Sequence, residues 1–285
     1  RHAVDMADRV ARAQHRIALG CQPGMSARHG APGDMFVGQN LHEYALPMTG
    51  FSLIPVIDLK GGMVVHAREG RREAYQPVRS RLCSGAEPAD IARALLDLHP
   101  FAVLYIADLD AIEQRGDNRA SIETIRRQHP DLELWADTGI GDEGAVAHWL
   151  RQGLARPVIG SESLHDIELL PLMRERSEAF RPVLSLDYRG EEFTGPAALL
   201  DHPERCWPQD VLAMNLHCVG SDKGPDLKLI VELARRVPGC RVYAAGGVRS
   251  VEDLQQVKAV GAAGALLASA LHDGRLGAAQ LAQFS

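Results

Sequence analysis

From residue 52 onward, hydrophobic residues gather in short continuous runs that alternate with segments of helical apolar spacing. Continuous apolar runs are typical of strands buried on both faces, as in a parallel sheet. The runs predict strands at 53–57, 103–107, 132–136, 157–159, 183–186, 211–214, 241–245 and 264–267. Amphipathic segments predict helices at 88–98, 119–128, 143–152, 226–236 and 251–260. Repeated strand–helix units without a change of pattern predict a single (β/α)8 barrel, the TIM-barrel architecture.

The chain also contains an internal repeat. Residues 103–164 align without a gap over residues 211–272, at a constant offset of 108 (211 − 103). Gly139 falls on Gly247 in this register, and Ser161 falls on Ser269. Because a long internal repeat constrains the architecture, we expect the barrel to consist of two half-barrels of four strands each.

Residues 1–47 differ from the rest of the chain. They contain four histidines and little periodic pattern, and the first strong strand signal follows Met48. We therefore expect residues 1–47 to form a poorly ordered N-terminal extension and residues 48–285 to form the barrel.

Composition narrows the classes of partner. The net charge of −6 argues against nucleic acid or an anionic membrane as the main partner. No apolar run approaches the roughly 20 residues of a membrane span. The five cysteines are odd in number and include no C-x-x-C pair, which favours reduced thiols in a cytoplasmic protein over a disulfide framework or a zinc site. These features are compatible with either a monomer or a homo-oligomer.

Two aspartates are the strongest candidates for chemistry. In this type of barrel the active site forms at the C-terminal ends of the strands. Asp58 and Asp187 directly follow the first and fifth apolar runs, at positions that lie opposite each other across the barrel mouth. Such a pair can divide the roles of general acid and general base. The alternative is that each carboxylate caps a loop or a following helix.

Other polar residues near strand ends are candidate substrate contacts. Asp108 follows the second predicted strand, and Asn215 and His217 follow the sixth. Arg68 lies in an arginine-rich loop after the first strand and is a candidate contact for a phosphate or carboxylate. The competing interpretation is that these side chains cap loops or are solvated.

A phosphate site is predicted in the second half. Gly246 and Gly247 follow the seventh strand, and Ser269 follows the eighth. Glycines let backbone N–H groups approach an anion closely, and the loops after strands seven and eight are the usual phosphate site of this fold.

The matching place in the first half contains Gly139, Gly160 and Ser161. A second phosphate site there would suit a ligand with two phosphate ends. Asp137 opposes this prediction, because a carboxylate repels a phosphate dianion. The alternative is that these glycines only form tight turns.

Two segments resemble a known family. The segment Ile-Pro-Val-Ile-Asp-Leu-Lys-Gly-Gly-Met-Val-Val at 54–65 and the segment Ala-Gly-Gly-Val-Arg-Ser-Val-Glu-Asp-Leu at 245–254 are similar to the histidine-biosynthesis barrels. These are phosphoribosylformimino-aminoimidazole-carboxamide ribotide isomerase and the cyclase subunit of imidazole glycerol phosphate synthase. The resemblance covers about residues 52–280.

The resemblance implies an Amadori rearrangement of an aminoaldose to an aminoketose, with Asp58 as the base and Asp187 as the acid. It also implies a substrate with one phosphate per half-barrel, and no metal or redox cofactor.

The chain departs from the isomerase pattern in several places. Met214 stands where the isomerase has a catalytic threonine, Asp137 interrupts the first glycine-rich loop, and Ala268-Ser269 replaces Gly-Arg. The loop after the fifth strand is also short. Two further interpretations therefore stay open: a paralogue that acts on another phosphorylated metabolite in one-carbon cofactor (methanopterin, methanofuran) metabolism, and a non-catalytic barrel that binds a phosphometabolite. The cyclase alternative would require a glutaminase partner.

Overall fold

The computed structural model describes residues 50–176 and 180–284, so the predicted extension at 1–47 lies outside the described residues. Parallel strands follow one another around a ring in which β11 pairs with β1 and closes the sheet. The ring contains β1 (Ser52–Lys60), β4 (Val103–Asp108), β5 (Glu133–Asp137), β6 (Arg156–Gly160), β7 (Val183–Arg189), β9 (Asp210–Asn215), β10 (Arg241–Ala245) and β11 (Gly264–Leu267). The predicted (β/α)8 barrel is confirmed.

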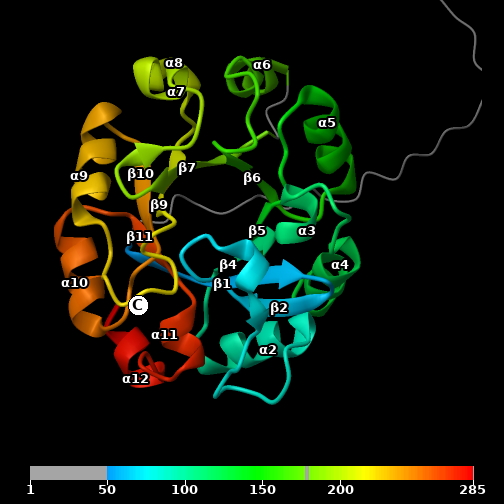
Figure 1. Cartoon of the computed structure of the whole chain (residues 1–285), viewed down its shortest axis with the longest axis vertical. Coiled ribbons are helices and arrows are strands. Elements are labelled where there is room, and N and C mark those ends of the chain that lie inside the picture. The colour runs from blue at the N-terminus through cyan, green and yellow to red at the C-terminus, as the bar shows by residue number, and fades with distance from the viewer. Residues whose placement is uncertain (1–49, 177–179, 285) are drawn as a thin grey trace, which may run out of the picture. The chain divides into compact units, whose positions relative to one another are not determined.

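Helices surround the ring of strands on its outside (Figure 1). The longer ones are α2 (Pro88–Leu98), α4 (Arg119–Gln128), α5 (Glu143–Gln152), α6 (Leu169–Arg176), α9 (Leu227–Arg236) and α10 (Val251–Ala259). Short helical segments complete the loops: α3 (Leu109–Ile112), α7 (Ala198–Asp201), α8 (Pro203–Cys206), α11 (Ser269–His272), α12 (Ala278–Leu281), and the 3-10 turns η1 (Arg72–Ala74) and η2 (Ala282–Phe284). Within the described ranges, no helix combines the length and apolarity needed to cross a membrane.

The helix starts follow from local sequence. The side chains of Asp142, Asp226 and Ser250 each accept a hydrogen bond from the third backbone N–H of the helix that follows, in α5, α9 and α10. Such caps satisfy N–H groups that have no partner inside the helix. They fix where each helix begins, and therefore the length of each loop at the barrel mouth.

Alternation along each strand separates two cores. On β1, Ile57 and Leu59 belong to the cluster packed between the sheet and the helices, whereas Ile54 belongs to the cluster inside the barrel. The inner cluster contains two large aromatic side chains, Trp135 and Tyr243, whose rings meet edge to face with centroids 5.3 Å apart. The barrel is thus filled below its mouth, and its open space lies at the C-terminal ends of the strands.

An ion network closes the opposite end of the barrel. Asp210 is fully buried at the start of β9. Its carboxylate accepts hydrogen bonds from Arg156 (2.5 Å), Arg241 (2.7 Å) and the Tyr243 hydroxyl (3.1 Å). These guanidinium groups hold the pKa of Asp210 below its usual value despite burial. The residues come from the N-terminal parts of β6, β9 and β10, with β7 lying between β6 and β9, so the network links strands across this end of the barrel.

Each half-barrel begins with an antiparallel hairpin that the sequence patterns did not predict. β2 (Met63–His66) pairs with β1, and β3 (Gln76–Pro77) pairs with β2. In the second half β8 (Glu192–Phe193) pairs with β7. The two hairpins lie at corresponding places in the two halves, and the longer first hairpin brings η1 to the barrel mouth.

Candidate active site

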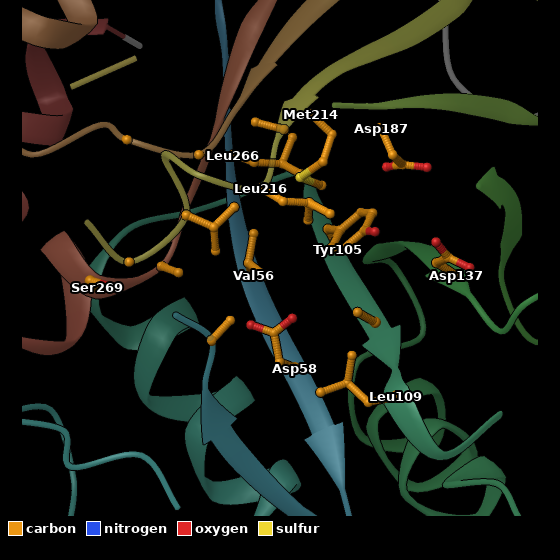
Figure 2. A pocket seen from close by; sticks show the side chains of 18 of the residues that line it. Val56, Asp58, Tyr105, Leu109, Asp137, Asp187, Met214, Leu216, Leu266 and Ser269 are labelled. Atoms are coloured by element: carbon orange, nitrogen blue, oxygen red, sulfur yellow. The ribbon is translucent and has the colours of Figure 1, made fainter. Parts of the chain in front are cut away.

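A pocket of about 930 Å³, part of it open to solvent, lies at the C-terminal ends of the strands. Its wall mixes apolar side chains with four carboxylates, two arginines and a glycine-rich turn. Figure 2 shows three of the carboxylates, Asp58, Asp137 and Asp187, among the apolar side chains. The wall contains Val56, Asp58, Ala67, Arg72, Tyr75, Tyr105, Ala107, Leu109, Ile112, Asp137, Glu162, Asp187, Met214, Leu216, Val219, Gly220, Ser221, Ala245, Gly246, Gly247, Val248, Leu266, Ala268, Ser269 and Arg275.

Asp58 projects into this pocket from β1. Strand alternation places its side chain on the same side as Val56, whereas Ile57 and Leu59 pack outward against the helices. Burial raises the pKa of Asp58 to about 7, and the nearby Arg72 guanidinium opposes the rise. No described residue donates a hydrogen bond to its carboxylate, so both oxygens are available to a ligand.

Asp187 faces the pocket from β7 and is held by a network of hydrogen bonds. One oxygen accepts from Ser185 Oγ (2.7 Å), and the other accepts from Ser161 Oγ (3.0 Å) and the Glu162 backbone N–H (3.3 Å). Burial raises its pKa to about 6, the hydroxyl donors oppose the rise, and the neighbouring Glu162 adds to it. Asp187 is therefore oriented by the protein, whereas Asp58 is not.

Asp137 is a third aspartate of the pocket wall, at the end of β5. Its side chain is only 7% exposed. One oxygen accepts the backbone N–H of Gly139 at 3.0 Å. Burial raises the pKa of Asp137 to about 7; the Gly139 N–H opposes the rise, and the charges of Asp187 and Glu162 add to it.

Glu162 and Arg72 complete the charged part of the wall. Arg72 lies in η1 on the first hairpin loop, and its guanidinium donates a hydrogen bond to the Glu162 carboxylate. Lys60 Nζ donates to the Arg72 backbone carbonyl at 2.5 Å and fixes the loop. The arginine-rich loop thus reaches the pocket through Arg72.

Tyr105 lies on β4 among these carboxylates. The side chain is 3% exposed, and none of the described residues forms a hydrogen bond with its hydroxyl, which faces the pocket. Burial and the charges of Asp137, Asp187, Asp58 and Glu162 raise the pKa of Tyr105 well above its ordinary value. The hydroxyl therefore stays protonated and can donate or accept a hydrogen bond at the pocket surface.

The second half supplies the wall opposite this acidic region. Gly246 and Gly247 have φ values of +98° and +85°, which favour glycine. A Cβ on Gly247 would collide with the carbonyl of Gly224. The Gly246 and Gly247 N–H groups donate to no acceptor within the described ranges. Ser269 Oγ lies in the same wall and is 2.9 Å from His66 Nε2.

The corresponding residues of the first half lie behind the pocket wall. Gly139, Gly160 and Ser161 are not among the residues that line it. The Gly139 N–H and the Ser161 hydroxyl already donate to Asp137 and Asp187. The two halves therefore present different chemistry at equivalent positions.

Four other predicted contacts, Asp108, Asn215, His217 and Arg68, are not among the residues that line the pocket. Asp108 is 1% exposed and accepts from the Asn118 backbone N–H (2.6 Å) and the Ala111 backbone N–H (3.2 Å), so it caps α3. The side-chain nitrogen of Asn215 donates one hydrogen bond to the backbone carbonyl of Gly190 and another, of 2.8 Å, to the carboxylate of Asp226. Arg68 is exposed to solvent and absent from the wall. The capping alternative thus describes Asp108 and Asn215.

Sequence patterns gave no indication of several wall residues. Tyr105 lies within an apolar run that predicts only core, and Glu162 lies just after the fourth predicted strand. Arg275 lines the pocket from the segment after α11 and pairs with Asp273 at 2.7 Å. In the described part of the chain no group of histidine, cysteine and acidic side chains is arranged to hold a metal ion.

Comparison with known proteins agrees with this architecture. The family model described as "Histidine biosynthesis protein" matches residues 52–277. An uncharacterised protein of Methanocaldococcus jannaschii is 30% identical over 229 residues, which are 79% of this chain and 94% of that protein.

Two bacterial relatives carry the name 1-(5-phosphoribosyl)-5-((5-phosphoribosylamino)methylideneamino)imidazole-4-carboxamide isomerase. The one from Gemmatimonas aurantiaca is 31% identical over 240 residues, covering 81% of this chain and 97% of its own length. The one from Sphingopyxis alaskensis is 32% identical over 250 residues, covering 82% and 97%. The chain therefore belongs to the histidine biosynthesis protein family.

Proposed function

We propose that the protein is an isomerase that converts a phosphorylated aminoaldose into the corresponding aminoketose, with Asp58 and Asp187 as its catalytic residues. The observation that carries the proposal is that both carboxyl groups face one pocket, which is also lined by Gly246 and Gly247, whose N–H groups have no acceptor among the described residues. The isomerase name of the bacterial relatives supports the type of reaction.

The chemistry requires one acid and one base. The acid protonates the ring oxygen of the sugar, so that the ring opens to a protonated imine at C1. The base then removes the proton from C2, and the electron pair of that C–H bond forms the enolamine. A proton added at C1, together with loss of the proton of the C2 hydroxyl, yields the aminoketose, so that neither protons nor electrons are gained or lost overall. The nitrogen of the substrate stabilises the intermediate, and the reaction needs no other electron sink.

The two carboxyl groups suit these steps. Their pKa values of about 7 and about 6 put both protonation states within reach near neutral pH. The hydrogen bonds hold Asp187 in a fixed orientation but favour its carboxylate form, so Asp187 acts as the acid from its less populated protonated form. Asp58, which has no such donors among the described residues, can follow a moving proton as the base once it is ionised. This division of roles is the one that the family resemblance implies.

Residues of the second half are the proposed phosphate site. The Gly246 and Gly247 N–H groups, together with Ser269 Oγ and the Arg275 guanidinium, line one side of the pocket. Backbone N–H groups and a guanidinium are common phosphate donors. A phosphate held there would anchor the sugar so that C1 and C2 lie between the two aspartates.

The test is a turnover assay in D2O with two substrates: the ribotide named in the relatives, and a phosphoribosylamine with a single phosphate. Isomerisation places a solvent deuteron at C1, which NMR detects. We expect Asp58→Asn and Asp187→Asn each to lower the rate about 10²- to 10⁴-fold, with binding largely kept. The exposed Asp131→Asn is the control. Unchanged turnover in Asp58→Asn would overturn the mechanism, and binding without turnover in the unmodified protein would indicate a binding barrel instead.

A further inference from the structure

Equivalent hydrogen-bond donors of the two half-barrels differ in whether a protein acceptor occupies them. Gly247 and Gly139 occupy the same place in the repeat, as do Ser269 and Ser161. In the second half the Gly247 N–H has no acceptor among the described residues. In the first half the Gly139 N–H donates to Asp137 and the Ser161 hydroxyl donates to Asp187. The donors that a phosphate would need in the first half are therefore already occupied by carboxylates.

Gly160 lies between these two carboxylates. From the place that a Cβ of Gly160 would occupy, Asp137 Oδ2 is 3.2 Å away and Asp187 Oδ2 is 3.6 Å away. The absence of a side chain at Gly160 thus makes room for two acidic groups close together. A phosphate dianion placed beside them would face two like charges in a partly buried site.

Among the described residues, the cation that offsets this group of carboxylates is Arg72, and it is already paired. Its guanidinium pairs with Glu162, which is itself part of the same wall. Asp137, Asp187 and Glu162 together outnumber Arg72, so this end of the pocket is acidic. The end formed by Gly246, Gly247 and Ser269 presents hydrogen-bond donors instead.

Tyr105 shows that the acidic end is open to a ligand. It is 97% buried by its neighbours, being 3% exposed, yet its hydroxyl has no hydrogen-bond partner in the described part of the chain. Figure 2 shows the hydroxyl on the side of the ring that faces Asp137, at the surface of the pocket. Because Tyr105 lines the pocket, a ligand at this end can form a hydrogen bond with its hydroxyl without displacing a protein group.

We infer that the acidic end of the pocket, formed by Asp137, Glu162 and Tyr105, is a subsite for a protonated amine, so that the substrate carries a single phosphate. The phosphate occupies the Gly246–Gly247 end, and the amine occupies the opposite end. Figure 2 shows Ser269, from the first end, across the view from Asp137. This inference rests on the proposed function for the place of the phosphate. It names the substrate class more narrowly: a sugar monophosphate with an amino group distant from the phosphate.

The test measures binding and not turnover, by calorimetry at about pH 8 in a buffer without phosphate. One ligand pair is glucosamine 6-phosphate against glucose 6-phosphate, which differ by an amino group. The other is ribulose 1,5-bisphosphate against ribulose 5-phosphate, which differ by a second phosphate. We expect the protein to favour the amine at least about tenfold, and to bind the bisphosphate no more tightly than the monophosphate.

Asp137→Asn keeps the shape of the side chain and removes its charge. We expect it to reduce the amine preference to about threefold or less and to improve bisphosphate binding about tenfold, whereas Asp131→Asn changes neither ratio. Tyr105→Phe, a second variant, should weaken binding of both hexose phosphates about threefold, since both lose the same partner hydroxyl.

Two outcomes would overturn the inference: a preference of the unmodified protein for the bisphosphate, or an amine preference that survives in Asp137→Asn. Loss of turnover is a separate matter. If the amine preference holds but neither substrate is isomerised, the proposed reaction fails and the subsite stands.

Discussion

Replacing Asp137 by asparagine should stabilise the protein, and increasingly so as the pH rises. The pKa of Asp137 is raised from the ordinary value of 3.8 to about 7, mainly because the side chain is buried. Folding therefore favours the protonated carboxyl group. Its stabilising effect is complete below about pH 4 and is lost as the pH rises towards about 7, where the folded protein must hold a buried carboxylate.

The magnitude follows from the size of the shift. Each unit of pKa difference corresponds to about 1.4 kcal/mol, so the rise from 3.8 to about 7 costs roughly 4 kcal/mol at pH values above the folded-state pKa. At about pH 5 only the first part of this range has been crossed, and the cost is about 1–2 kcal/mol. Asp137→Asn removes the charge while its side-chain oxygen still accepts the Gly139 N–H.

The assay is urea unfolding followed by circular dichroism at a series of pH values from about 5 to about 8. We expect the gain in free energy of unfolding to grow by about 2–3 kcal/mol across this range. Asp131→Asn, an exposed change just before the same strand, should alter stability by less than about 0.5 kcal/mol at every pH. A gain that is equal at both ends of the range would show that Asp137 is not desolvated in the folded protein, and the reasoning would be refuted.

Three further outcomes test other parts of the structure. Asp210→Ala leaves Arg156 and Arg241 without their buried carboxylate and should lower the free energy of unfolding by about 3–5 kcal/mol in urea titrations; a loss below about 1 kcal/mol would contradict the role of that network. Gly247→Ala should abolish phosphate binding and cost about 1–3 kcal/mol more than Gly239→Ala, because both have positive φ but only Gly247 meets backbone, at Gly224. If Asp58 and Asp187 transfer protons, a plot of kcat/KM against pH should be a narrow bell whose two limbs lie at about pH 6 and about pH 7. A value of kcat/KM that does not change between about pH 5 and about pH 9 would exclude these two residues as the proton-transfer groups.

The barrel could be predicted from the sequence because its strands are buried on both faces. Each run such as Val103–Ala107 is apolar throughout, and the observed strand β4 (Val103–Asp108) extends it by one residue. The predicted helix at 143–152 coincides with α5 (Glu143–Gln152). The hairpin strands β2 and β8 are short and lie at the barrel mouth, so they lack the apolar runs by which the strands of the ring were found.

The candidate site was harder to predict. A position at a strand end places a residue near the barrel mouth, but it does not say whether the side chain faces the pocket or binds the backbone of a loop. Asp58 and Asp108 both follow apolar runs, yet Asp58 faces the pocket whereas Asp108 turns to the N–H groups of Ala111 and Asn118. That difference depends on the loop that follows each strand. The role of Tyr105 could not be predicted for a different reason. It lies within a buried apolar run, and nothing in the sequence of such a run indicates that a tyrosine hydroxyl reaches a cavity.

The repeat explains why the pocket is polarised along its length. Two half-barrels of common descent would begin with matching donors, and Gly139 and Gly247 still share a positive φ and the same place in the fold. A carboxylate at residue 137, where the second half has Ala245, is enough to change the first half, because its oxygen takes up the N–H that Gly247 leaves free. The same group destabilises the folded protein near neutral pH by the several kcal/mol estimated above. A binding role would explain why a buried charge that lowers stability stands at a strand end in the pocket. For this reason Asp137, more than either proposed catalytic aspartate, distinguishes this chain from a barrel that binds two phosphates.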